Sequence, residues 1–372
     1  MSRIFSKSAK SALVAAAAVA GTVSGAYAAD MPLKAKPVPA VPFFIVNDTS
    51  VSFTYFPNST DPGVSGGSDA VPGGIAGAKN SFARYQGSID HFDVWTYGTN
   101  LIHAEFDQYG KQDPTEGTPG AAGSREFFGF AQSTLGFNEI SHSKAFSTFL
   151  TKDVSLMFRI TAGVQDDYLN EQTTQYAPGL MFDLNMPGVV EVGITAYKEF
   201  TNNSFNVCGP PGFGSLNGPG AAFSGGANTC LGGGAFNGTR DFEWTWKLFS
   251  FVSEPLTFLP PSMPLTFVNV LNVTGPKGTG ITPANCAALG CGGPLGAFAS
   301  NETKTEVFED ARLSLDASKV WWGKPGLWDM YVGYRYWYNK FGTNHNAALF
   351  STIAPDTSIE STAYIGTTYH FK

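Results

Sequence analysis

The sequence predicts an all-β protein: a single antiparallel transmembrane β-barrel of about 12 strands, with 10 or 14 strands as alternatives. Three observations lead to this fold class. Apolar residues recur at every second position through most of the chain. The connections between these segments are alternately short and long. Aromatic residues gather near the segment ends, where the interfacial girdles of membrane barrels lie.

The composition excludes several other classes of protein. Only 14% of the 372 residues are charged, against about 25% in ordinary soluble domains. No apolar run approaches the ~18 residues that a spanning helix needs. The formal net charge of -7 and the lack of clustered Lys and Arg argue against nucleic acid polymers as partners.

The N-terminus has the organisation of a secretory signal peptide over residues 1–28. Three basic residues precede an apolar stretch at 12–23, and the small residues of a cleavage site end at Ala28. A short amphipathic anchor is the alternative. Residues 29–47 are rich in proline and predict an extended periplasmic lead-in. Residues 48–372 then form the barrel with its long external loops.

The alternation locates the strands. In residues 153–165, for example, Leu156, Phe158 and Ile160 alternate with Ser155 and Arg159, which is typical of a strand with one apolar face. Strands in one direction are predicted near 48–56, 95–108, 153–165, 189–200, 265–274 and 328–339. Strands in the other direction are predicted near 81–92, 125–137, 176–186, 239–250, 304–318 and 358–371. The segments near 81 and 265 are the least regular.

The connections predict an orientation. Short turns at Pro187-Gly188, at the Ser-Glu-Pro sequence 253–255 and at 322–326 are expected on the periplasmic side. Two long Gly-rich connections are expected outside, and they carry Cys208, Cys230, Cys286 and Cys291. Pairing Cys208 with Cys230, and Cys286 with Cys291, is the simplest of three connectivities for disulfides formed in an oxidising compartment.

The last strand carries a further signal for location. Ile365, Tyr369 and Phe371 share one face and place an aromatic side chain near the chain end. This resembles the terminal sorting signature of outer-membrane barrels, although here Lys372 follows the aromatic residue. The sequence therefore predicts the outer membrane of a Gram-negative bacterium as the location, with membrane lipid and the barrel-assembly machinery as partners.

The same alternation predicts which side chains face the lumen. On 95–108 these are His103, Glu105 and Asp107, and on 125–137 they include Phe128 and Phe130. A flat base could stack on the two rings while sugar hydroxyls bind the polar groups, since base–aromatic stacking contributes ~1–3 kcal/mol. The alternative is that both rings fill the interior of a narrow barrel.

Three arginines are also predicted to face inward, and carboxylates are expected opposite them. The arginines are Arg159, Arg312 and Arg335, and the carboxylates are Asp183, Glu191, Asp310 and Asp316. Such mixed-sign ladders hold a barrel wall rigid, and a lumen of both signs is expected to favour neither anions nor cations strongly.

Three segments carry a resemblance to a known family. They are TNLIHAEFDQYGKQD at 99–113, REFFGFAQSTLGF at 125–137 and VGYRYWYNKFG at 332–342. They resemble the Tsx family of nucleoside-specific outer-membrane channels and comprise 39 of the 344 residues that follow the signal peptide. The resemblance implies a narrow 12-stranded barrel that passes nucleosides along aromatic and polar lumenal sites.

Other functions remain as alternatives. A general porin, or a structural or adhesive barrel with its Cys-containing loops outside, would share the fold. A barrel lipid hydrolase is disfavoured, because the five histidines lack an identifiable serine partner with an orienting acid and no G-x-S-x-G motif occurs. The sequence predicts no enzyme, no cofactor and no metal site, since the cysteines lack zinc-type spacing.

Overall fold

The computed structural model describes residues 43–62, 64, 79–113, 122–167, 171–202, 239–278, 303–346 and 355–371. The predicted signal peptide, all but the end of the lead-in, and the four cysteines with their predicted disulfides lie outside these residues. Those expectations therefore stay predictions.

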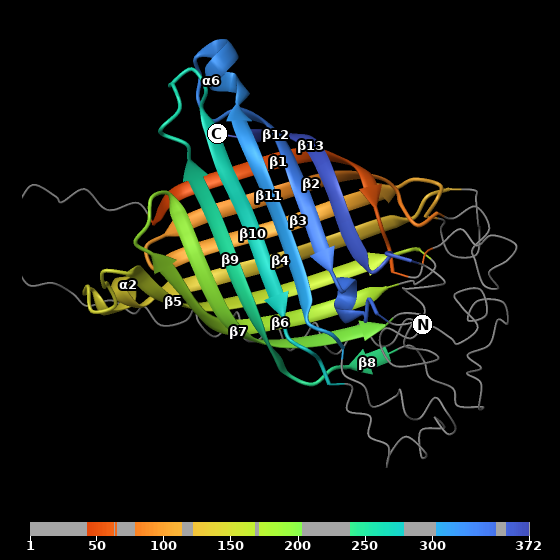
Figure 1. Ribbon diagram of the computed structural model, residues 1–372. Helices are drawn as coiled ribbons and strands as arrows, with labels where there is room; N and C mark the ends of the chain where they lie inside the picture. Colours follow the sequence, from red (N-terminus) through yellow and green to blue (C-terminus); the bar gives the residue numbers. More distant parts are fainter. Residues whose placement is uncertain are drawn as a thin grey trace, which may run out of the picture. The chain divides into compact units, whose positions relative to one another are not determined.

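The described chain forms one closed antiparallel barrel (Figure 1). Each long strand pairs with its neighbours along the chain, the first long strand pairs with the last, and the sheet closes on itself. The strands are β1 (Phe44–Ser59), β2 (Phe82–Trp95), β3 (Gly98–Tyr109), β4 (Arg125–Gly136), β5 (Thr151–Gln165), β6 (Gln172–Leu184), β7 (Val189–Asn202), β8 (Thr239–Asp241), β9 (Thr245–Pro255), β10 (Leu265–Thr274), β11 (Glu306–Asp316), β12 (Trp328–Tyr338) and β13 (Ile359–Phe371). All except the three-residue β8 are long strands, which makes a 12-stranded barrel.

The predicted fold class and all twelve predicted strands are confirmed, including the two least regular ones. Some predicted boundaries differ from the observed ones. The first strand begins at Phe44 rather than near residue 48. The Ser-Glu-Pro sequence 253–255 belongs to β9, and the turn follows it. Residues 239–250 are not one strand, because buried Phe242 separates β8 from β9.

The two ends of the barrel differ. At the turn end, β2 and β3, β4 and β5, β6 and β7, β9 and β10, and β11 and β12 are joined by residues 96–97, 137–150, 185–188, 256–264 and 317–327. The first of these connections has two residues. The loop end carries the connections that contain the undescribed internal residues. Gly188 closes the turn between β6 and β7 with a φ of 68°, a conformation that glycine adopts without strain.

Short helices occur at the turn end. Helix α2 (Phe137–Ser141) and helix α6 (Ala317–Trp322) each follow a strand directly, whereas the 3-10 turn η2 (Lys340–Gly342) follows β12 at the loop end. Of the predicted turn at 322–326, Trp322 is the last residue of α6, and the remaining residues lie in the connection to β12. Asp316 begins α6 by accepting a hydrogen bond from the backbone N–H of Lys319. Among the described residues, no helix is long and apolar enough to cross a membrane.

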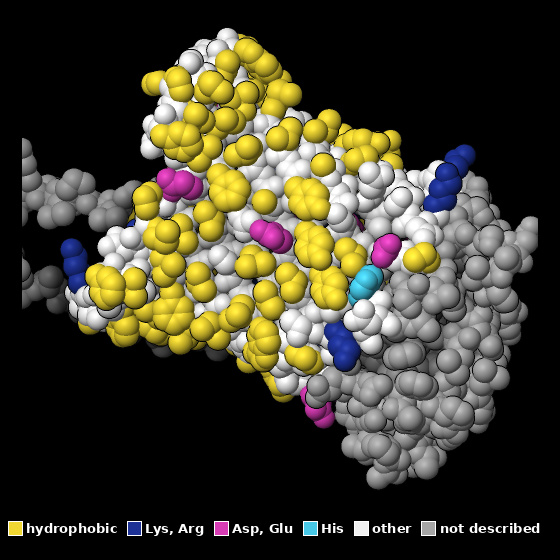
Figure 2. Space-filling model, viewed as in Figure 1, with side chains coloured by type: hydrophobic (Ala, Val, Ile, Leu, Met, Phe, Trp, Pro, Cys, Tyr) yellow, Lys and Arg dark blue, Asp and Glu magenta, His cyan; other side chains and the backbone are white. Residues whose placement is uncertain are grey.

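The outer wall is apolar and the interior is polar. Large apolar side chains at alternate positions, such as Ile102, Phe158 and Ile194, are about half exposed on the outside. Figure 2 shows hydrophobic side chains spread over the wall that β9 to β12 form in this view. By contrast, the buried side chains include Arg84, Asp107 and Glu360. An apolar exterior around a charged interior is the arrangement of a barrel that faces lipid.

Two tyrosines pack across the interior onto glycines of the neighbouring strand. Tyr331 lies opposite Gly366, and Tyr364 lies opposite Gly333 in the pairing of β12 with β13. A side-chain carbon at either glycine would collide with the facing ring. The two rings and fully buried Phe56 form one cluster. Only glycine therefore fits at these two strand positions.

Replacing Gly333 with Val is expected to destabilise the folded barrel by about 1–3 kcal/mol, because the new side chain displaces the Tyr364 ring. Urea unfolding of the barrel in detergent measures the change. Gly87→Val is the control, since nothing lies within 4 Å of a side-chain carbon placed at Gly87. Equal stability of the two variants would contradict this packing.

Candidate functional site in the barrel interior

The central group of the predicted site comes together around His103. Its Nδ1 lies 2.6 Å from Asp90 Oδ1 on β2, and its Nε2 lies 3.1 Å from Glu105 Oε2 on β3. Gln86 donates a further hydrogen bond to Glu105 Oε2 at 2.9 Å. Both ring nitrogens face carboxylates, and only the doubly protonated imidazolium donates to both.

The two predicted phenylalanines have different surroundings. The Phe130 ring stacks on His103 at 5.1 Å between centroids, and the Arg159 guanidinium carbon lies 4.0 Å from the Phe130 centroid. Phe128 is half-buried and meets Phe130 edge to face at 6.5 Å. The Phe130 ring is thus packed against His103 and Arg159. The ring contact of Phe128 within the described residues is the edge-to-face contact with Phe130.

Arg159 lies between two aromatic side chains rather than among carboxylates. Its guanidinium carbon is 5.0 Å from the Phe249 centroid on β9 and 4.0 Å from that of Phe130. Its Nε is buried and has no hydrogen-bond partner among the described residues. Asp183 and Glu191 were expected to face the inward arginines, but they lie nearer the turn end of their strands than Arg159 does.

The other predicted arginines line the opposite part of the wall. Arg335 Nε donates to Asp310 Oδ2 at 2.8 Å, which confirms that expected pair, and the guanidinium lies over Phe56 at 4.6 Å. Arg312 lies over the Tyr331 ring at 4.8 Å, and its Nε has no hydrogen-bond partner in the part of the chain that the structure describes. The expected role of Asp316 opposite an arginine was wrong, because this residue begins helix α6.

Asp107 faces inward as predicted but lies too deep to contact a solute. Its side chain is buried, with Arg84 Nε at 3.9 Å from Oδ1. Glu105 keeps 15% of its side chain exposed, and Arg335 keeps 12%. Of the polar residues predicted on β3, Glu105 and His103 therefore stay accessible beside the aromatic group, whereas Asp107 does not.

A buried ion network near the loop end was not anticipated. Lys340 Nζ lies 2.8 Å from Asp61 Oδ1 and 3.2 Å from Glu360 Oε2. Arg84 donates to Glu360 Oε1 at 3.1 Å. Arg84 lies at an inward-facing position of a predicted strand, so the alternation could have predicted that its side chain faces the interior. Lys340 and Asp61 follow their strands, where no period operates.

Two histidines contact hydroxyl groups, a pattern relevant to hydrolases. His91 Nδ1 lies 2.9 Å from Thr49 Oγ1, and its Nε2 lies 3.7 Å from Asp93. A catalytic triad has the reverse arrangement, with the nucleophile at Nε2 and the acid at Nδ1. His345 Nδ1 meets Ser358 Oγ at 3.1 Å. Within the described residues no carboxylate pairs with His345, so these contacts favour structural roles.

Comparisons with known proteins give only distant likenesses. No protein-family model matches the chain, and no curated protein matches it. Among solved structures, the translocator domain of the autotransporter NalP from Neisseria meningitidis is 9% identical, with 88% of this chain and 89% of that one covered at a TM-score of 0.35. The outer membrane protein OpdK from Pseudomonas aeruginosa is 8% identical, with 87% and 98% covered at a TM-score of 0.28.

The class of protein follows from the barrel itself. Each of the twelve long strands in the described part of the chain is paired on both sides, so the barrel is closed, and its exterior is apolar while its interior holds buried charges. In lipid only closed barrels satisfy the backbone groups of strands. The chain is a transmembrane β-barrel of the outer-membrane type, and its location is the outer membrane of a Gram-negative bacterium.

Proposed function

We propose that the barrel is an outer-membrane channel for passive diffusion of small polar solutes, with nucleosides as the preferred class. The observation that carries the proposal is the interior group in which Phe128 presents a half-buried ring close to Phe130, His103 and Glu105. A nucleoside has one flat base and a sugar with several hydroxyls. It needs one ring to stack on and nearby hydrogen-bonding groups, and this group offers both.

The members of the group have separate roles in this proposal. Phe128 is the stacking surface, because Phe130 is already held between its neighbours. Phe130 and His103 support the site, and Glu105 accepts hydrogen bonds from the ribose hydroxyls. Arg159 supplies donor groups, since within the described residues it forms no ion pair. The resemblance of 99–113 and 125–137 to the Tsx family supports the same assignment, because these segments form β3 and β4.

Passive channels require weak binding, strong enough for a solute to enter and loose enough for it to leave. Nucleosides are therefore expected to reduce the ion current through single channels in planar bilayers, at concentrations where sugars without a base do not. A loss of base stacking of ~1–3 kcal/mol corresponds to a roughly 5- to 100-fold weaker block.

Phe128→Ala is expected to weaken the nucleoside block by about that factor and to leave open-channel conductance equal or higher. The matched control is Phe127→Ala on the same strand, since Phe127 faces outward and packs on Phe106 at 5.0 Å. Equal nucleoside block in the two variants would contradict the assignment of Phe128 as the stacking surface.

The same recordings separate the other functions. Discrete conductance without any effect of nucleosides, together with equally fast uptake of sugars, indicates a general porin and overturns the nucleoside preference. The absence of discrete conductance overturns the channel itself and favours a structural or adhesive barrel.

A further inference from the structure

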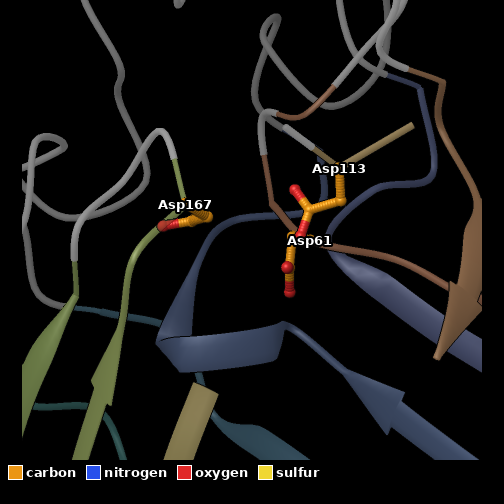
Figure 3. Close-up of side chains that lie close together, drawn as sticks. All are labelled: Asp61, Asp113 and Asp167. Atoms are coloured by element: carbon orange, nitrogen blue, oxygen red, sulfur yellow. The ribbon is translucent and has the colours of Figure 1, made fainter. Parts of the chain in front are cut away.

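Three aspartates from distant parts of the sequence meet at the loop end (Figure 3). Asp61 follows β1, Asp113 follows β3 and Asp167 follows β5. These three strands run in the same direction, so the residues after them reach the same rim. All three side chains are buried, with at most 1% of each residue exposed, and one carboxylate oxygen from each lies within 4.8 Å of the others.

Among the described residues, the hydrogen bonds around this group leave a carboxylate oxygen of Asp113 without a partner. Asp61 Oδ1 accepts from Lys340 Nζ at 2.8 Å, and Oδ2 accepts from Gln165 Nε2 at 2.7 Å. Asp113 Oδ2 accepts from the Ser124 hydroxyl. Asp113 Oδ1 is buried and has no hydrogen-bond partner. A buried carboxylate oxygen without a donor is costly, and this one belongs to a group of like charges.

The charges near the group increase this cost. Asp61 and Asp167 add two further buried carboxylates beside that of Asp113. Lys340 contacts Asp61, but its single positive charge is shared with Glu360. Either a proton or a cation has to balance the charge at Asp113.

We propose that Asp61, Asp113 and Asp167 bind a divalent cation of the calcium type at the loop end of the barrel. Calcium takes carboxylate oxygens at about 2.3–2.6 Å, so two ligands on opposite sides of one ion lie about 5 Å apart, and the observed separation fits. The ligands are oxygens only, without His or Cys, which favours Ca²⁺ over zinc or copper. Such a site would have a structural role in addition to the proposed transport, because one ion would connect the residues that follow three different strands.

The test uses the full-length barrel folded in detergent. Titration of the metal-free protein with CaCl₂ is expected to give a saturable heat of binding. At a concentration about 100 times the dissociation constant, Ca²⁺ is expected to raise the unfolding temperature by about 5 °C relative to EGTA. Asp113→Asn is expected to abolish both effects and to be at least as stable as the native chain in EGTA, because it removes a like charge.

Asp356→Asn is the matched control, since Asp356 is exposed and asparagine tolerates its left-handed backbone. This variant should keep the full response to Ca²⁺. No heat of binding and equal unfolding temperatures of the native chain in Ca²⁺ and EGTA would overturn the proposal, and would leave a proton as the balancing charge. The measurements on the native chain test the cation site even if the Asp113→Asn variant does not fold.

Discussion

Lys340→Met is expected to destabilise the folded barrel by about 3–5 kcal/mol, the cost of leaving buried carboxylates without their cation. Lys340 is 1% exposed, and its Nζ contacts Asp61, Glu360 and the backbone oxygen of Thr60 at 2.7–3.2 Å. Methionine keeps the length of the side chain but provides no donor. Urea unfolding in detergent measures the loss.

Two controls make this result specific. Lys144→Met removes the same charge from an exposed turn and should change stability by less than about 0.5 kcal/mol. Glu360→Gln combined with Lys340→Met should cost less than the sum of the single changes, because the two groups contact each other. Additive effects would show that Lys340 contributes through packing alone.

The pH dependence of this contribution has a defined sign. Burial lowers the pKa of Lys340, but the nearby Asp61 and Glu360 raise it more, and the net shift is upward. A group with a raised folded-state pKa stabilises fully below its unfolded pKa, which is about 10.4 for lysine. The contribution of Lys340 should therefore be constant at neutral pH and be lost only as the pH rises through its folded-state value.

The strands could be predicted because one physical rule governs them. A wall between lipid and a polar interior requires alternation, and each of the twelve predicted segments forms a strand. The alternation did not predict the interruption of the strand at Phe242. Phe242 is buried and lies over the Lys277 ammonium at 4.6 Å, so the chain breaks between β8 and β9 although apolar residues continue.

The site could be predicted only in part. Alternation gives the direction of a side chain, and it placed His103, Glu105 and Phe130 inside correctly. It gives no information on which partner a long side chain reaches across the lumen, so Arg159 on two aromatic rings was not foreseen. The residues at the loop end, Lys340 and Asp113 among them, lie outside any repeat, and their meeting depends on the closed shape of the barrel.

The distribution of charges in the lumen changes the expected ion selectivity. Arg335 is paired with Asp310, whereas Asp183 and Glu191 at the turn end have, among the described residues, Lys152 as their one ion-pair partner. Asp183 and Glu191 lie directly opposite each other on β6 and β7. Lys152 comes only within 4.0 Å of Asp183 and is 40% exposed. Asp48 and Asp329 flank His370 at the same end. Rings of carboxylates favour cations in channels.

Single channels of this protein are therefore expected to be cation-selective, in contrast to the weak preference that the mixed signs in the sequence suggested. In a KCl gradient across a planar bilayer, the reversal potential should shift toward the equilibrium potential of K⁺. High salt should reduce the selectivity, because it screens exposed charges. A reversal potential near zero or toward that of Cl⁻ would contradict the assignment of these carboxylates to the ion path.

Neutralising the facing pair, with Asp183→Asn and Glu191→Gln together, is expected to move the reversal potential toward zero. The double variant should fold well, because like charges directly opposite on neighbouring strands repel each other. Glu309→Gln is the control, since Glu309 lies on the outer face of β11, where it accepts a hydrogen bond from Asn269 at 3.1 Å. The control removes a negative charge without touching the lumen, so it should leave the reversal potential unchanged. Equal shifts in both variants would mean that the selectivity arises from the net charge of the protein and not from its interior.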